Sequence, residues 1–290
     1  MVRFGLIGAS GYVAPRHMEA IKNVNGELVT ILDPNDSVGI IDRFHPKASY
    51  FSEYERFDRE VDRLKRMGKG LDYISIASPN YLHDAHIRFT LKNGSHAICE
   101  KPLVLNPYSI ISLEELEKET GRKIYPILQL RLHPTIISLK ESVGKKNKVQ
   151  LKYVTPRGKW FHYSWKGDLV KSGGIATNIG IHFFDMLLWI FGSVKNNFVE
   201  YHTNYKAGGY LELERANVNW ELSVDERDLP HDDWKAFRSI KVNDEEIDFS
   251  DGFTDLHTKS YEEILNGNGF TLEDSKPALD LVHKIRNYKT

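Results

Sequence analysis

The stretch Ile76-Ala-Ser-Pro-Asn-Tyr-Leu-His83, with Cys99-Glu-Lys-Pro102 farther along the chain, decides the fold. Two short apolar runs, Tyr73 to Ala77 and His96 to Cys99, are separated by a helical pattern of apolar residues. This order predicts a strand, a helix and a second strand. In such a unit the ligand crevice lies beyond the carboxyl ends of the parallel strands. We therefore expect the Ser-Pro-Asn and Glu-Lys-Pro segments to face one site.

The beginning of the chain predicts a turn that binds a dinucleotide. The apolar run Arg3 to Ile7 leads into Gly8-Ala-Ser-Gly-Tyr-Val-Ala14 and then into a helical pattern. Glycine lets backbone N–H groups approach a pyrophosphate, and the dipole at the helix N-terminus favours the anion. The spacing departs from G-x-G-x-x-G because one extra residue separates Gly8 from Gly11. A tight structural turn is therefore the alternative interpretation.

An acidic residue follows the next predicted strand, Glu27 to Leu32. Asp33 stands about 20 residues after the glycine turn, where dinucleotide-binding proteins hold the adenosine ribose. A carboxylate accepts hydrogen bonds from both ribose hydroxyls and repels a 2′-phosphate, so we expect NAD in preference to NADP. The alternative is an aspartate that only opens a turn before Pro34.

The remaining pattern divides the chain in two. Residues 1–125 predict a doubly wound Rossmann domain with a parallel sheet, completed by a helix at Tyr108 to Thr120 and a strand at Lys123 to Leu130. Residues 126–290 predict a substrate-binding α+β domain with a mostly antiparallel, open sheet. Its expected elements are strands at Gln150 to Thr155, Asn197 to Tyr205, Tyr210 to Val224 and Ala236 to Phe249, and helices at Thr254 to Asn266 and Lys276 to Tyr288.

Composition narrows the functional classes. The 290 residues are 41% hydrophobic and carry a net charge of −1, so no global field draws the protein to nucleic acid or to an anionic membrane. The single cysteine, Cys99, excludes an internal disulfide, and no Cys/His cluster has zinc spacing. The sequence opens on a strand, without an apolar signal core, and no run reaches the length of a membrane span. We expect a cytoplasmic protein without a metal.

A polar stripe interrupts an apolar helical segment in the second half. Asn178, His182 and Asp185 follow i, i+4, i+7 spacing after the Ser-Gly-Gly segment that begins at Ser172, so they project from one helical face. A histidine of this kind is usually structural, and a simple bond between His182 and Asp185 is one possibility.

Together these motifs resemble the signature of the glucose-fructose oxidoreductase and inositol dehydrogenase family of NAD(P)-dependent sugar oxidoreductases. The resemblance rests on Pro-Asn-x-x-His, on Gly-x-His-x-x-x-Glu-Lys-Pro, and on Gly-Gly followed by Asn-x-x-x-His-x-x-Asp, where the family's second signature is Asp-x-x-x-His-x-x-Asp. It implies that Lys101 lies beside the nicotinamide and that His182 faces the substrate. Asn178 departs from the pattern, because most of the family has Asp at this position.

One subgroup is similar over nearly the whole chain. Sequence motifs typical of this subgroup occur at Ser172 to His182, at Ile127-Leu-Gln-Leu-Arg-Leu-His-Pro134, and at Arg157-Gly-x-Trp with Ser164-Trp-Lys-Gly167. This subgroup, the UDP-N-acetyl-2-amino-2-deoxy-glucuronate oxidases, oxidises the sugar 3-hydroxyl on the way to bacterial surface polysaccharide (O-antigen). The resemblance implies a UDP-sugar substrate, recycling of NAD by 2-oxoglutarate and a homo-oligomer, with a tetramer favoured.

Charge and aromatic residues near position 160 fit such a substrate. Arg and Lys side chains suit the diphosphate and carboxylate of an activated uronic acid, although a solvated basic loop is the alternative for any one of them. The residues assigned to the substrate are Lys101, Arg131, Arg157, Lys166, Lys171, Thr177, Asn178 and His182. The residues assigned to the cofactor are Gly8, Ser10, Gly11, Tyr12, Val13, Asp33, Ser78, Asn80, His83, Glu100, Lys101 and Gln129.

The expected reaction is hydride transfer from the sugar, with Lys101 and His182 as the proton-transfer pair. Either His182 or Lys101 is the base, and the sequence does not separate the two assignments. Another sugar or cyclitol dehydrogenase of the same family is the first rival function. A cofactor-binding sensor without turnover is the second, and it would need neither of these two side chains.

Overall fold

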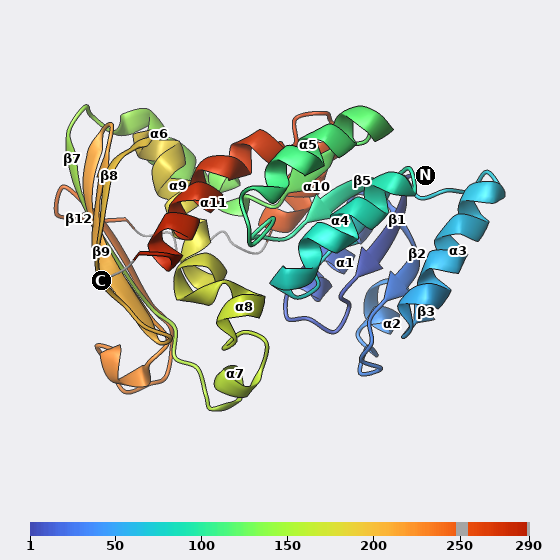
Figure 1. Cartoon of the computed structure of the whole chain (residues 1–290), viewed down its shortest axis with the longest axis horizontal. Coiled ribbons are helices and arrows are strands. Elements are labelled where there is room, and N and C mark those ends of the chain that lie inside the picture. The colour runs from blue at the N-terminus through green and yellow to red at the C-terminus, as the bar shows by residue number, and fades with distance from the viewer. Residues whose placement is uncertain (248–254, 289–290) are drawn as a thin grey trace. The chain divides into compact units, whose positions relative to one another are not determined.

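The computed structural model describes residues 1–247 and 255–288, and the chain forms two compact units (Figure 1). The described part of the first unit is 1–104, 108–129 and 255–274, and that of the second is 105–107, 130–247 and 275–288. The division proposed from the sequence, 1–125 and 126–290, assigns 255–274 to the second part, whereas contacts between helices α1 (Ala14–Asn23) and α10 (Leu256–Leu265) hold it in the first unit.

The first unit is built on a six-stranded sheet of order β3-β2-β1-β4-β5-β6 in which every pair is parallel. This order is that of the dinucleotide-binding doubly wound sheet, so the predicted Rossmann fold is confirmed. The strands are β1 Arg3–Ile7, β2 Glu27–Leu32, β3 Ser49–Phe51, β4 Tyr73–Ile76, β5 His96–Cys99 and β6 Ile124–Pro126.

Helices form two layers on this sheet. Helices α1, α10 and α2 (Ile41–Phe44) share one apolar cluster with Phe4 and Leu6, which alternate along β1 and so point to the same face. The second layer contains α3 (Tyr54–Arg66), α4 (His83–Lys92) and α5 (Ser109–Thr120), in which α4 contacts α5, β4 and β5. With helices on both faces, a ligand has access at the carboxyl ends of the strands.

The second unit is built on a sheet of order β12-β11-β7-β10-β9-β8. Among the described strands of this sheet only β7 and β10 pair in parallel, so the predicted mostly antiparallel sheet is confirmed. The strands are β7 Asn147–Val154, β8 Val194–His202, β9 Lys206–Leu213, β10 Ala216–Ser223, β11 Phe237–Val242 and β12 Glu245–Glu246.

Helix α9 (Ile181–Phe191) packs on this sheet through aromatic side chains. The ring centres of Phe184 and Trp220 lie 5.2 Å apart, and those of Phe183 and Tyr153 lie 4.9 Å apart. The segment Leu169–Phe191 is long and apolar enough to cross a membrane by composition, yet 83% of its apolar window is buried inside the structure. The other helical elements are η1 Asn80–Leu82, η2 Gln129–Leu132, α6 Pro134–Ser142, α7 Trp160–Tyr163, α8 Leu169–Ser172, η3 Ala176–Gly180, η4 Glu226–Asp228 and α11 Leu272–Arg286.

The structure differs from the expected elements in several places, including the expected strand Lys123 to Leu130, which ends at Pro126 and is followed by η2. The single strand expected at Tyr210 to Val224 is part of a hairpin, β9 and β10, because Glu214 and Arg215 make the turn without the Gly, Asn or Pro that marks most turns. Strand β3 was not expected, since three residues carry too little alternation to be recognised. The strand expected at Ala236 to Phe249 is divided between β11 and β12, and residues 248–249 lie outside the described chain, as does Thr254 of the expected helix.

Candidate active site

The glycine turn lies against the segment that follows β4. Gly8 has φ +96°, and a side-chain carbon placed on it would lie 2.6 Å from the Ala77 carbonyl carbon and from the Ser78 nitrogen. No other residue type fits both this backbone conformation and this distance. The turn leads directly into α1, whose first turn contains Pro15. The N-terminus of α1 therefore stands at the carboxyl ends of β1 and β4.

Asp33 organises the same turn. Its Oδ2 accepts hydrogen bonds from the Ser10 backbone N–H at 2.8 Å and from the Ser10 hydroxyl at 2.9 Å, and its Oδ1 accepts one from the Asn35 N–H at 2.8 Å. The carboxylate is buried at 4% exposure. The sequence did not predict this contact with Ser10. As a consequence, the glycine turn itself holds in place Asp33, the residue expected to bind the ribose.

His83 joins the segments that follow β4 and β5. Its Nε2 lies 2.8 Å from the Ser78 carbonyl oxygen, and its Nδ1 lies 2.7 Å from the Pro102 carbonyl oxygen. Burial lowers the pKa of His83, so the ring is neutral and donates from one nitrogen at a time. The Ser-Pro-Asn and Glu-Lys-Pro segments are therefore brought together, as the strand order requires.

Lys101 follows Glu100 at the end of β5 and is half-buried, and the Lys101–Pro102 peptide is cis. The Glu100 N–H donates to the Ile76 carbonyl at 2.9 Å, which ties this segment to β4. The side-chain oxygen of Gln129 is buried and has no hydrogen-bond partner among the described residues. Such an oxygen is ready to accept a hydrogen bond from a ligand.

These residues fit an NAD-type dinucleotide. The turn approaches closely enough for backbone contact with a pyrophosphate, the carboxylate of Asp33 stands at the end of β2, and Gln129 offers an unused acceptor. Tyr12, by contrast, is 85% exposed, with the Arg16 guanidinium 5.7 Å from its ring centre.

In the second unit, the segment 172–191 is almost wholly buried. Only Asn178, His182 and Trp189 are partly accessible within it. Asn178 lies in the π-helical turn η3, and His182 lies at the start of α9. The two polar residues expected to meet the substrate are therefore also the two polar side chains that this helical segment leaves accessible.

The third member of the expected stripe, Asp185, is buried and paired. The Arg131 Nη2 lies 2.7 Å from Asp185 Oδ1, and the Arg131 Nε lies 3.0 Å from Oδ2. The two side chains are 8% and 5% exposed. This bidentate pair fixes η2 to α9, so Arg131 has a structural role that the sequence did not predict.

A pair of glycines precedes η3. Gly173 and Gly174 have φ of +81° and +78°, and a side-chain carbon on Gly173 would lie 2.7 Å from the Thr177 Cγ2. Thr177 is 1% exposed, and its hydroxyl has no hydrogen-bond partner among the described residues. The turn thus places Thr177 and Asn178 side by side at the start of the buried segment.

The basic segment 157–171 is more accessible. Arg157 and Lys171 are exposed, and the Lys166 ammonium lies 5.0 Å from the Trp165 ring centre and 5.5 Å from that of Trp160. Burial, and then the charge of Arg157, lower the pKa of Lys166. Lys171 forms an exposed ion pair of 3.8 Å with Asp168, which also caps α8. Part of the expected positive charge is therefore neutralised within the segment.

Comparisons with known proteins agree with this geometry. Residues 2–127 match the model of an oxidoreductase family with an NAD-binding Rossmann fold, and residues 140–226 match that family's C-terminal alpha/beta domain. The WlbA (WbpB) dehydrogenase of Thermus thermophilus, crystallised with NAD and UDP-GlcNAcA, is 48% identical with a TM-score of 0.95, over 100% of this chain and 96% of that one. The chain belongs to this NAD-binding oxidoreductase family.

Two more distant proteins are similar to the chain, the first in fold and the second in sequence. WlbA of Bordetella pertussis, crystallised with NADH and UDP-GlcNAcA, has a TM-score of 0.78 at 19% identity over 98% of this chain and 95% of that one. Glucose-6-phosphate 3-dehydrogenase of Bacillus subtilis is 27% identical over 67% of this chain and 55% of its own length. The chain spans about half the length of the curated relatives that it matches, from 35% to 62%.

The stability of the fold should depend on pH because of His86, a residue that the sequence analysis did not single out. Its Nδ1 lies 2.9 Å from the Ser78 hydroxyl, and burial, with a smaller effect of His83, lowers its pKa from 6.5 to about 4. Between these values the unfolded chain binds a proton that the folded chain does not. The folded state is therefore favoured above pH 6.5 and loses this advantage as the pH falls towards about 4.

We expect the difference in unfolding free energy between the native chain and His86→Gln to fall by about 3 kcal/mol between about pH 7 and pH 4. Denaturant titrations of both proteins at each pH measure it. The other buried histidines are common to both chains and cancel in the difference. A difference that stays constant with pH would show that folding does not shift the pKa of His86.

Proposed function

We propose that this chain oxidises the sugar 3-hydroxyl of UDP-GlcNAcA (UDP-N-acetyl-2-amino-2-deoxy-D-glucuronate) in the formation of bacterial surface polysaccharide. The observation that carries this proposal is the similarity to the Thermus thermophilus WlbA dehydrogenase over the full chain at 48% identity. The two accessible polar residues of the segment 172–191, Asn178 and His182, are those that the substrate would meet.

The chain's own residues divide the work as follows. Gly8, Asp33 and Gln129 hold the dinucleotide, and NAD supplies the hydride acceptor. Lys101 and His182 are assigned to the 3-hydroxyl, and one of them takes its proton as the hydride leaves. His182 has an imidazole whose reference pKa of about 6.5 suits a base near neutral pH, and Lys101 then polarises the developing ketone.

Arg157, Lys166 and Lys171 are assigned to the diphosphate and the carboxylate, since their charges gather in one accessible segment. Trp160 is 54% exposed beside Lys166, which leaves its ring available to stack on the uracil. Thr177 contributes the buried hydroxyl described above. Arg131 supports the site indirectly, because its ion pair with Asp185 fixes η2 to α9.

The decisive experiment mixes the purified chain and NAD with a panel of sugars and follows the absorbance of the reduced nicotinamide. We expect a signal with UDP-GlcNAcA and none with glucose 6-phosphate or inositol. Turnover beyond a single stoichiometric burst should require 2-oxoglutarate, because the Thermus thermophilus protein has also been crystallised with NAD and alpha-ketoglutarate. Oxidation of a simple sugar in place of UDP-GlcNAcA would assign the chain to another branch of the family, and no signal with any sugar would favour a sensor.

Asn178 gives a prediction about specificity. A uronate beside an aspartate at this position would bring two anions together, and at about 5 Å with an effective dielectric near 20 their repulsion is about 3 kcal/mol. Asn178→Asp should therefore bind UDP-GlcNAcA about a hundredfold more weakly. The matched ligand without a carboxylate, UDP-N-acetylglucosamine, should lose far less affinity. Dissociation constants for both ligands with NAD present measure the effect.

Two controls sharpen that measurement. Asn178→Ser keeps a neutral hydrogen-bonding group, so it should not discriminate between the two ligands. Equal losses for both ligands in Asn178→Asp would show that Asn178 does not sense the carboxylate, whatever the substrate of the enzyme is.

The assembly and location are part of the same proposal. We propose a cytoplasmic homo-oligomer, with a tetramer favoured. Alternate residues of β7 and β10, including Lys148, Gln150, Asn217 and Asn219, are exposed on one face of the second sheet, which offers a surface for a second copy. Light scattering of the purified chain measures the mass, and a monomer at assay concentration would reject this part.

A further inference from the structure

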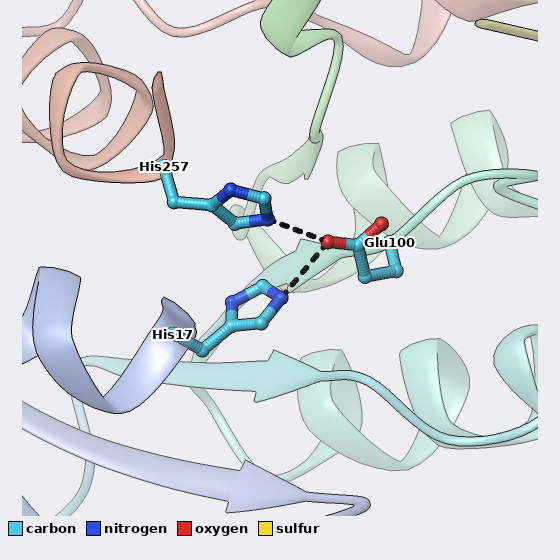
Figure 2. A group of neighbouring side chains, drawn as sticks. All are labelled: His17, Glu100 and His257. Carbon is cyan, nitrogen blue, oxygen red and sulfur yellow. Dashed lines mark hydrogen bonds and ion pairs between the residues drawn. The ribbon is translucent and has the colours of Figure 1, made fainter. Parts of the chain in front are cut away.

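A buried group of polar side chains in the first unit includes Glu100, the residue that immediately precedes Lys101. Figure 2 shows His17 from α1, His257 from α10 and Glu100 from the end of β5, with both imidazoles directed at the same carboxylate oxygen. The Nε2 atoms of His17 and His257 lie 3.1 and 2.8 Å from Glu100 Oε1. The three residues are 0%, 3% and 4% exposed, in the order His17, His257, Glu100.

The hydrogen bonds continue beyond this group. His17 Nδ1 lies 2.8 Å from the Tyr261 hydroxyl, which lies 2.5 Å from the Ser75 hydroxyl. One arrangement of protons satisfies these four contacts: Ser75 donates to Tyr261, Tyr261 donates to His17, and both histidines donate from Nε2 to Glu100. An ionised carboxylate on Glu100 and a neutral imidazole at His17 are the states that this arrangement requires.

The electrostatics support those states. Burial alone would raise the pKa of Glu100, but the hydrogen bonds from His17 and His257 outweigh it and hold the pKa well below its usual range. Burial lowers the pKa of His17, against the hydrogen bond to Glu100 that raises it. Glu100 is therefore an anion at neutral pH and His17 is neutral.

A metal ion is the competing interpretation, because the ligand atoms of the three side chains lie within 4.8 Å of one another. Ligands of a tetrahedral zinc ion stand about 2.0–2.1 Å from it, which separates them by roughly 3.3 Å. The observed 2.8 Å between His257 Nε2 and Glu100 Oε1 is shorter than that and is an ordinary hydrogen bond. The Nε2 protons that make these hydrogen bonds occupy the positions from which a metal would be bound.

The carboxylate connects the catalytic segment to the cofactor turn. Glu100 immediately precedes Lys101, and its Oε2 lies 3.3 Å from the Lys101 backbone nitrogen. Its Oε1 is bonded to α1, the helix that begins where the glycine turn ends. On the other side of Lys101, the Pro102 carbonyl is bonded to His83. The backbone of Lys101 is thus held from both sides.

We propose that Glu100 is a positioning residue. His17 and His257 hold its carboxylate in place, and the carboxylate in turn fixes the backbone of Lys101 relative to the glycine turn. The proposal rests on the proposed role of Lys101 in proton transfer. Because α10 supplies His257, the segment 255–274 becomes part of the catalytic support of the first unit. A displacement of about 1 Å at a reacting group costs up to roughly a hundredfold in rate, so loosening this contact should be visible in kcat.

The main test compares two replacements of His257 in the full-length enzyme. His257→Gln can still donate a hydrogen bond to Glu100, whereas His257→Leu cannot. We expect kcat with UDP-GlcNAcA to fall about tenfold or more in the Leu variant and to stay within about threefold of native in the Gln variant. The dissociation constant for NAD should change by less than about threefold in both. Equal kcat values in the two variants, or a loss that appears only in NAD binding, would overturn the proposal.

Two further measurements do not depend on turnover. NMR of the isotope-labelled imidazole nitrogens should show both rings protonated at Nε2 and the Nδ1 of His17 without a proton, and Glu100→Gln should shift the resonances of both rings. Elemental analysis should show no stoichiometric zinc. An Nδ1 proton on His17, an Nε2 without a proton on either ring, or a stoichiometric metal would overturn the network. If instead Lys101→Ala were fully active while these signatures held, the proposed function would have failed and the network would stand.

Discussion

Replacing Lys101 with alanine is expected to lower kcat by about 10² or more, while the fold and the affinity for NAD stay close to native. The side chain emerges from the end of β5, beside the strand whose following segment packs on the glycine turn. It is half-buried rather than part of the core, so its removal leaves no large cavity. The loss should therefore appear in the chemical step, measured as kcat with UDP-GlcNAcA and confirmed by thermal unfolding of the variant.

A matched control is available on the same unit. Lys92 is exposed in the last turn of α4, and Lys92→Ala should leave kcat unchanged. Near-normal turnover in a correctly folded Lys101→Ala protein would remove Lys101 from the reaction, and the resemblance on which its role was predicted would then extend only to the fold.

The same variants separate the two assignments of the base. If His182 takes the proton, His182→Gln should lose the acidic limb of the kcat–pH profile, whereas Lys101→Ala keeps that limb at a lower rate. If Lys101 is the base, the reverse holds. Rates measured from about pH 5 to pH 9 in the presence of saturating NAD distinguish the two outcomes.

Much of the fold follows from local sequence patterns. The strand–helix–strand unit around residues 73–99, the parallel order of the first sheet and the mostly antiparallel second sheet were all predicted and are confirmed. The position of α10 was not predicted. Periodicity indicates which face of an amphipathic helix is buried but not which element covers that face, and the partner of α10 lies more than 200 residues earlier in the chain.

The buried polar group of His17, Glu100 and His257 could not be predicted from the sequence. His17 lies on the face of α1 that also carries Ala14, Met18 and Ile21, and a polar residue at such a position was the available signal. His257 and Tyr261 occupy corresponding positions on α10. A single polar residue on an apolar face indicates that it has a partner, but the identity of that partner depends on tertiary contacts.

Asp185 is a related case. The spacing correctly indicated a polar side chain on the helix, but this side chain is buried in an ion pair and is not accessible as Asn178 and His182 are. The i, i+4, i+7 pattern placed Asp185 with Asn178 and His182 on one polar face, yet its carboxylate is buried on the bidentate guanidinium of Arg131. The helix changes from π-helical to α-helical between Asn178 and His182, so the ideal geometry of a single helix does not apply across the stripe.

Breaking this pair from one side is expected to be severe. Arg131→Met leaves a 5%-exposed carboxylate on Asp185 without its main counter-ion, and such a change costs about 3–5 kcal/mol of the unfolding free energy. Combining Arg131→Met with Asp185→Val removes both charges together, so the double variant should recover most of that loss. Denaturant unfolding of the two variants and the native chain measures the coupling, and equal destabilisation by the single and double changes would show that the pair does not determine stability here.

The double variant also tests whether Arg131 binds the substrate, because it restores the fold without restoring the guanidinium. A native KM for UDP-GlcNAcA in this variant would confine Arg131 to holding α9, and with it His182, in place.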